Sequence, residues 1–248
     1  NATGYAQTAV AAWDKDYCHL IAHTAPLLTG SRARLTNTVI TATAGEFTIT
    51  GTGCVFRGIQ YQFGDSATAT SLVGVALSGN GRNAFIGCGF YGPFDAGIGA
   101  AASQRMLTIT SSQDNFFYGC SFGQRTILST SSTGAVVAFN GTNNTNNVFE
   151  KCLLTAYNSN TASATVHFAN NAMPDSGWTM FKDCHFVNHY NANIADPIRF
   201  DTGAHGTVLL PGSTLSGLGT LVWATNRKTT IFTFGAAPAG TGGVGGNP

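Results

Sequence analysis

The sequence predicts an all-β fold, a single-stranded right-handed parallel β-helix of about five to six coils with a period of about 32 residues. Three observations predict it. Charged residues make up only 9% of a chain that holds 31 glycines, one cysteine recurs at a nearly constant interval, and short stretches alternate apolar with small polar residues. Such a composition favours hydroxyl-covered strands and tight turns over charged amphipathic helices.

The chain has 248 residues, of which 43% are hydrophobic, enough to fill a sizeable core. The net charge of +1 gives no basic field to collect nucleic acid, so we expect no nucleic-acid partner. No stretch of 18 or more apolar residues occurs, so no membrane partner is expected. The first residue is not methionine, and we expect either a removed leader or a start inside a longer chain.

Five of the six cysteines recur at a regular spacing. The first interval is 34 residues and the next three are 32 residues each. These positions are Cys54, Cys88, Cys120, Cys152 and Cys184. In a solenoid the same position of successive coils stacks at about 4.8 Å, so a periodic residue forms a column. We expect a column of buried, reduced thiols, and the absence of C-x₂₋₄-C spacing predicts no metal and no cofactor.

Phenylalanine flanks the periodic cysteine on both sides. Three residues before it stand Phe85, Phe117, Phe149 and Phe181, and two residues after it stand Phe56, Phe90, Phe122, Leu154 and Phe186. A second set of apolar pairs lies upstream, at Val75 and Leu77, Leu107 and Ile109, Val137 and Phe139, Val166 and Phe168, and Ile198 and Phe200. Both sets alternate as half-buried strands do, and each buried Phe contributes about 2 to 3 kcal/mol of transfer free energy.

Other repeat architectures fit this pattern less well. Tetratricopeptide and ankyrin repeats need amphipathic 3.6-residue spacing and good helix formers, whereas here Thr, Ser, Asn and Gly follow a period of two. Propeller blades need about 40 residues and four strands. The parallel β-helix is therefore the predicted repeat.

Polar residues near the cysteine follow the same register. Glu150 is expected beside Lys182, and Lys151 beside Asp183, so that both neighbours across coils have opposite charge. The asparagines five residues before the cysteine are expected to form an amide ladder at a turn. These asparagines are Asn83, Asn115 and Asn147.

The two ends of the chain depart from the repeat. Residues 6–22 hold the only helical pattern, expected to cap the first coil, with an attachment arm as the alternative. Ser216 lies 32 residues after Cys184 and predicts a degenerate sixth coil. The predicted organisation is an N-terminal arm or cap over 1–30, a β-helix domain over 31–234 and a flexible Gly-rich tail over 235–248.

A β-helix raises the question of polysaccharide cleavage, which needs two carboxylates about 5 to 9 Å apart across a groove. Glu150 and Asp183 are close in the repeat register, but each faces a lysine. Asp196 and Asp201 flank a strand and form a weaker candidate. We assign no catalytic residue and expect no enzyme, with a glycan hydrolase or lyase as the alternative.

The remaining cysteine and the histidines show no site pattern. Cys18 lies outside the period and is expected to be buried in the cap. His185 and His189 are expected to point outward from a strand. His19, His23, His167 and His205 show no companions. Exposed or internally satisfied histidines are the expected outcome.

The run "VFRGIQYQFGDSATATSLVGVALSGNGRNAFIGCGFYG", together with "NVFEKCLL" and "MFKDCHF", resembles β-helical virion proteins of tailed bacteriophages. The resemblance covers roughly residues 50–190 and rests on the N-x-F-x-x-C-x-F unit and on the S-G-N turn at 78–80. It implies a pectate-lyase-like fold and assembly as a homotrimer, as is common for such chains. Enzymatic relatives carry acidic clusters on one strand face, and no position here matches such a cluster.

These features together predict a non-enzymatic structural protein of a phage particle, a capsid decoration or cement protein or an external fibre. Its expected location is the external surface of the virion, and its expected partners are other capsid or tail proteins. The alternative is a tailspike-like receptor protein that binds or cleaves carbohydrate and contacts a host surface glycan. A secreted bacterial adhesin or passenger fragment, located outside the cell, is a third possibility.

Overall fold

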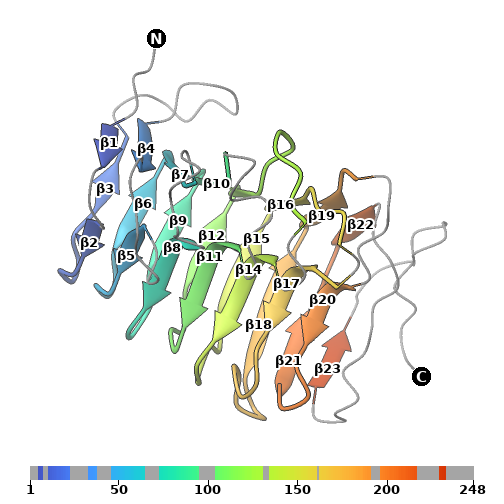
Figure 1. The fold of residues 1–248 in the computed structure, drawn as a ribbon. Helices are drawn as coiled ribbons and strands as arrows, with labels where there is room; N and C mark the ends of the chain where they lie inside the picture. The colour runs from blue at the N-terminus through green and yellow to red at the C-terminus, as the bar shows by residue number, and fades with distance from the viewer. Residues whose placement is uncertain are drawn as a thin grey trace.

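The chain folds into a right-handed parallel β-solenoid with a period of about 32 residues, which confirms the predicted fold class (Figure 1). The computed structural model describes residues 5–7, 11–22, 33–37, 46–64, 73–94, 104–130, 134–160, 162–190, 196–216 and 229–232. Every regular element in these ranges is a strand. None of the described segments is a helix long and apolar enough to cross a membrane.

Each coil of the solenoid contributes one strand to each of three parallel sheets, except that the last coil adds no described strand to the second sheet. Sheet 1 holds β1 (Tyr5–Gln7), β4 (Ala33–Asn37), β7 (Ile59–Gln62), β10 (Gly89–Tyr91), β13 (Ser121–Phe122), β16 (Leu153–Ala156), β19 (His185–Asn188) and β22 (Thr214–Ser216). Sheet 2 holds β2 (Ala11–Trp13), β5 (Phe47–Ile49), β8 (Val73–Ser78), β11 (Arg105–Thr110), β14 (Ala135–Asn140), β17 (Ala164–Phe168) and β20 (Asp196–Phe200). Sheet 3 holds β3 (Leu20–Ile21), β6 (Val55–Arg57), β9 (Ala84–Ile86), β12 (Phe116–Tyr118), β15 (Asn147–Glu150), β18 (Trp178–Lys182), β21 (Gly206–Leu209) and β23 (Thr229–Phe232).

Phenylalanine rings stack along the inside of sheet 3. The centroids of Phe85 and Phe117 are 4.7 Å apart, and those of Phe117 and Phe149 are 4.4 Å apart, with interplanar angles of 5° and 6°. Phe181 continues the column at 4.7 Å from Phe149. All four rings are fully buried. The spacing matches the distance between neighbouring strands, so ring contact and strand pairing reinforce each other.

The inner face of sheet 2 forms the second half of the core. The five predicted apolar pairs occupy equivalent positions of consecutive strands: Val75 and Leu77, Leu107 and Ile109, Val137 and Phe139, Val166 and Phe168, and Ile198 and Phe200. Phe47 and Ile49 extend this register by one coil. The period-two alternation of the sequence thus identified the buried face of this sheet.

The first periodic cysteine is out of register, which corrects the predicted columns. Phe56 pairs with Phe85, so Cys54 lies opposite Asn83, 29 residues away, and not opposite Cys88. The coil at this point is shorter than the 34-residue cysteine interval suggested. Phe56 therefore stacks on Phe85, with centroids 4.9 Å apart, and does not belong to the column of Phe90.

A similar shift occurs at the other end of the cysteine column. Thr214 pairs with His185, and the backbone N–H of Cys184 donates to Ser213 Oγ at 3.0 Å. Ser213, and not Ser216, is thus the residue opposite Cys184. The last described coil is again 29 residues long at this position, so counting 32 residues overshoots by three.

The expected amide ladder forms at the turn before sheet 3. Oδ1 of Asn115 accepts a hydrogen bond from the backbone N–H of Asn83, and Oδ1 of Asn147 accepts one from the N–H of Asn115, both at 3.1 Å. Asn83 Oδ1 accepts from the N–H of Cys54 at 2.8 Å. These asparagines are at most 1% exposed. Each side chain satisfies a buried donor of the preceding coil, which water cannot reach.

The expected N-terminal helix is wrong. The described part of residues 6–22 consists of strands and turns, in which β2 pairs with β5 and β3 pairs with β6. Trp13 packs edge-on against Phe56 with ring centroids 5.7 Å apart. Strand pairing and this aromatic contact outweigh a weak local helix propensity. Cys18, expected to be buried in a helical cap, is exposed.

Replacing one ladder asparagine tests the role of the turn. In Asn115→Ala the buried N–H of Asn83 loses its acceptor, so we expect the free energy of unfolding to fall by roughly 1 to 3 kcal/mol. Urea denaturation followed by circular dichroism measures this change. Thr142→Ala, at an exposed turn position, is the control and should remain within about 0.5 kcal/mol of the parent. Equal stability of the two variants would refute a structural role for the ladder.

Candidate functional site

The thiols of the cysteine column are buried and bonded to backbone carbonyls of the solenoid. The Sγ–H groups of Cys88, Cys120, Cys152 and Cys184 donate to backbone carbonyls of Phe56, Phe85, Phe117 and Phe149 at 3.3 to 3.5 Å. None of these four cysteines forms a disulfide, and each is buried. Burial raises the pKa of Cys120, whereas for Cys152 burial is outweighed by hydrogen bonds from the Cys120 and Cys184 side chains, which lower its pKa. Within the described ranges no group of three or more His, Cys, Asp or Glu could hold a metal ion.

One of the two expected ion pairs forms. Nζ of Lys182 lies 3.0 Å from Oε1 of Glu150, and this hydrogen bond raises the pKa of Lys182. Lys151 instead places Nζ 3.4 Å from the hydroxyl of Tyr118 in the preceding coil. The carboxylate of Asp183 lies against Gly212 of the following coil, so the two side chains diverge. The pairing predicted for Lys151 and Asp183 is therefore wrong.

The outer face of sheet 2 brings together charged residues that the sequence analysis left apart. Nε2 of His167 lies 2.9 Å from Oδ1 of Asp201, and His167 pairs in register with Arg199. Arg105, only 8% exposed, is close enough for its charge to affect the pKa of His167. Val166 and Ile198 are equivalent apolar positions 32 residues apart, so the residues that follow them, His167 and Arg199, must lie opposite each other. This spacing could have revealed the cluster from the sequence.

The remaining acidic and histidine residues considered from the sequence do not come together in one site. Asp201 bonds to His167, while the side chain of Asp196 lies outside the described residues, so this carboxylate pair gains no support. His205, expected to stand alone, lies against Asp175. His185 and His189 are exposed, as expected from their outward positions.

A groove runs over the outer face of sheet 1. Its volume is about 580 Å³, within the range of about 300 to 1,000 Å³ typical of ligand sites. We define the sheet 1 groove by its lining residues on five consecutive strands and their flanking turns. They are Gln60, Gln62, Tyr91, Phe94, Ser121, Phe122, Gly123, Gln124, Arg125, Leu153, Thr155, Val187 and His189. These residues offer amides, hydroxyls, aromatic rings, one guanidinium and one imidazole but no carboxylate.

The register of sheet 1 sets the floor of the groove. Gln62 pairs with Tyr91, so amide and phenol lie in one row across neighbouring coils. Thr155 pairs with Val187 two coils further along. Their strand neighbours point into the core, because alternate residues of a strand face opposite sides. The sequence analysis missed this groove, because its residues are not repeated and come from five coils.

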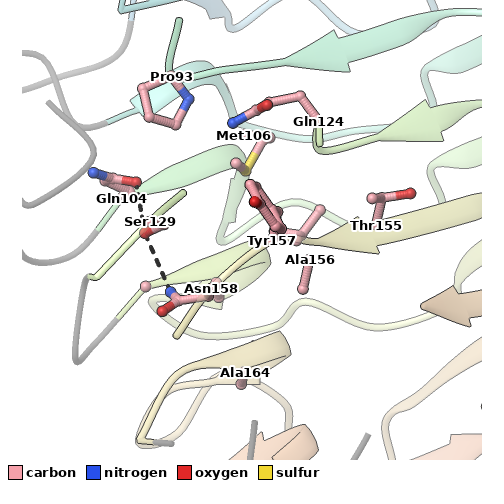
Figure 2. Close-up of a pocket in the computed structure, with 13 residues that line it drawn as sticks. Pro93, Gln104, Met106, Gln124, Ser129, Thr155, Ala156, Tyr157, Asn158 and Ala164 are labelled. Atoms are coloured by element: carbon pink, nitrogen blue, oxygen red, sulfur yellow. Dashed lines mark hydrogen bonds between the residues drawn. The ribbon is translucent and has the colours of Figure 1, made fainter. Parts of the chain in front are cut away.

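A second, smaller hollow adjoins the groove at the turn between sheets 1 and 2. Figure 2 shows that a row of hydrogen bonds joins Gln104, Ser129 and Asn158 on one side of it. Both bonds measure 3.2 Å. Gln124 and Thr155 line this hollow as well as the groove. Its volume of about 30 Å³ suits one or two waters, so it supports the groove wall and cannot seat a substrate.

Stability should depend on pH through His167. Burial is the largest cause that lowers the pKa of His167, and the charges of Arg199 and Arg105 lower it further. The hydrogen bond that His167 donates to the Asp201 carboxylate opposes them. The unfolded chain therefore takes up a proton at a higher pH than the folded chain. The free energy of unfolding falls as the pH drops below about 6.5, the ordinary pKa of histidine.

The variant His167→Gln tests this linkage. We expect it to reduce the loss of unfolding free energy between about pH 7 and pH 5, measured by urea titrations at each pH. The exposed His185→Gln is the matched control and should retain the parent slope. An unchanged slope in His167→Gln would show that this buried imidazole does not govern the dependence.

Two comparisons with known proteins gave no relatives. No protein-family model matches the chain. No curated protein matches it either. The outer faces of the solenoid are therefore the features from which a function can be inferred.

Proposed function

We propose that this chain is a non-enzymatic structural protein of a phage particle, which decorates the capsid or forms an external fibre as a homotrimer. The observation that carries the proposal is an apolar column on the outer face of sheet 3. One residue per coil forms it in register: Val55, Ala84, Phe116, Val148, Met180 and Leu209. Each is partly exposed in the single chain.

This apolar column favours assembly with further copies. The neighbouring outer column is mixed and holds Arg57, Ile86, Tyr118, Glu150 and Lys182, so the apolar strip is one column wide. A continuous apolar strip along a soluble chain marks an interaction surface, since its burial releases ordered water. Identical rods that associate side by side bury such strips with closed symmetry, and a trimer accords with the resemblance to phage β-helix proteins.

Three carboxylates that face bases of neighbouring coils support a structural role over a hydrolytic one. Glu150 is engaged by Lys182, Asp201 by His167, and Asp114 lies 3.8 Å from Arg82. Hydrolysis of a glycosidic bond needs two carboxylates facing each other with space for the sugar between them. Carboxylates that are each matched to a base serve cross-coil pairing instead.

The assembly part of the proposal is tested by charging the apolar column. Val148→Asp places a carboxylate where the interface must exclude water. We therefore expect the protein concentration at which half of the trimer dissociates to rise at least about 10-fold. Light scattering after size exclusion measures the mass, and circular dichroism checks that the coils persist. Thr142→Asp adds the same charge at an exposed turn and should remain trimeric. A parent protein that is monomeric at micromolar concentration would contradict the trimer.

The location on the particle is tested by imaging. Cryo-electron microscopy of purified phage particles that encode this chain should show a rod-shaped density on the capsid or tail that fits the solenoid. Particles that lack the gene are the control and should lose that density. Complete particles without such density would rule out the virion role.

A second candidate function is a carbohydrate-binding receptor protein. The sheet 1 groove favours it, because the groove combines hydrogen-bonding side chains with aromatic rings on a rigid sheet. This candidate is compatible with a place on the particle surface and differs from the first in requiring a ligand.

A further inference from the structure

We propose that the sheet 1 groove binds a short acidic oligosaccharide, whose carboxylate is held by Arg125. The inference rests on the second candidate function and gives it a substrate class. It follows from the charge of the groove, from the support of Arg125, and from the polar groups that the floor leaves available.

The charge of the groove selects an anion. Its lining holds two basic side chains, Arg125 and His189, and no carboxylate. Burial is the main cause that lowers the pKa of His189, and the positive charge of Arg125 lowers it further, so the two side chains lie near each other. Arg125 forms no ion pair with the described residues. An arginine without a protein carboxylate, beside a second basic group, is a ready partner for a ligand carboxylate, which its planar fork binds with two hydrogen bonds.

The side chain of Gln124 holds the turn that carries Arg125. Its Nε2 donates to the carbonyl of Ile127 at 2.7 Å, and its Oε1 accepts from the N–H of Ile127 at 2.8 Å and from that of Thr126. One side chain thus closes a loop of four residues. Because this turn is fixed before binding, Arg125 is presented to the groove with little ordering cost from the backbone.

The floor offers partners for hydroxyl groups. The amides of Gln60 and Gln62 form no hydrogen bond with described residues and lie on one face of β7, roughly 7 Å apart. An amide donates and accepts at once, as does the vicinal hydroxyl pattern of a sugar. The rings of Tyr91 and Phe94 supply apolar surface for the C–H face of a pyranose.

An oligosaccharide fits this floor better than an extended peptide. The backbone groups of β10 already pair with β7 on one side and β13 on the other. A peptide bound to this face would find no unpaired strand edge. Its backbone N–H and C=O groups would be removed from water without forming strand hydrogen bonds. A sugar needs only side-chain partners. The lining carries no carboxylate pair, so we expect binding without cleavage.

Calorimetric titration of the full chain with trigalacturonic acid tests the inference. We expect measurable affinity for this trisaccharide, and affinity at least 10-fold weaker for its fully methyl-esterified form, which has the same rings without the charge. Arg125→Ala should weaken binding of the acid roughly 10-fold or more and leave the ester unaffected. Raising the salt concentration from about 50 to 300 mM should weaken binding of the acidic trisaccharide and leave binding of the ester unchanged.

Controls keep this test separate from the assembly proposal. Lys15→Ala removes an exposed cation that belongs to neither the sheet 1 groove nor the apolar column of sheet 3, and this variant should bind as the parent does. The mass of each variant by light scattering and its circular dichroism show whether the trimer and the coils persist. No binding by a folded parent, equal binding of acid and ester, or unchanged binding by Arg125→Ala would each overturn the inference, while the assembly proposal would stand.

Discussion

The fold depends on side chains that satisfy buried backbone donors from one coil to the next. At the turn before sheet 3 the chain bends, so an N–H there has no strand partner and no access to water. Asn115 accepts the N–H of Asn83, and Asn147 accepts that of Asn115. An unsatisfied buried donor costs about 1 to 3 kcal/mol, so a slip of one residue is penalised at each of the three coils that carry a ladder asparagine. This register then places Phe117 over Phe85 and fixes each outer column.

The buried columns could be predicted because the same demand recurs at every coil. A residue type repeated at a fixed interval is visible without any structure, and it located the apolar pairs of sheet 2 and the pairing of Glu150 with Lys182. The prediction failed where the coil length changes. Alignment of "VFRGIQ" with "AFIGCG" matches Phe56 to Phe85 and Ile59 to Cys88, whereas counting from cysteine to cysteine conceals the shorter coil.

The remaining features depend on residues that occur only once. The contact of His167 with Asp201 joins two unrepeated side chains, so only the register of their strands could have indicated it. The sheet 1 groove likewise gathers single residues from five coils. Near the N-terminus the local sequence favours a helix, but the open strands of the next coil offer partners that an isolated helix lacks. Tertiary pairing therefore decides what local propensity leaves marginal.

The interior is nearly the same in each coil, so differences in function must come from the outer faces. Sheet 3 presents an apolar column, which suits contact with other copies, and sheet 1 presents a polar groove with Arg125 at its wall. The two lie on different sheets, so assembly through sheet 3 would leave each groove open. A trimer would then display three grooves at fixed spacing. Weak binding of one oligosaccharide unit becomes strong attachment to a repeating polymer, because the second and third contacts are intramolecular.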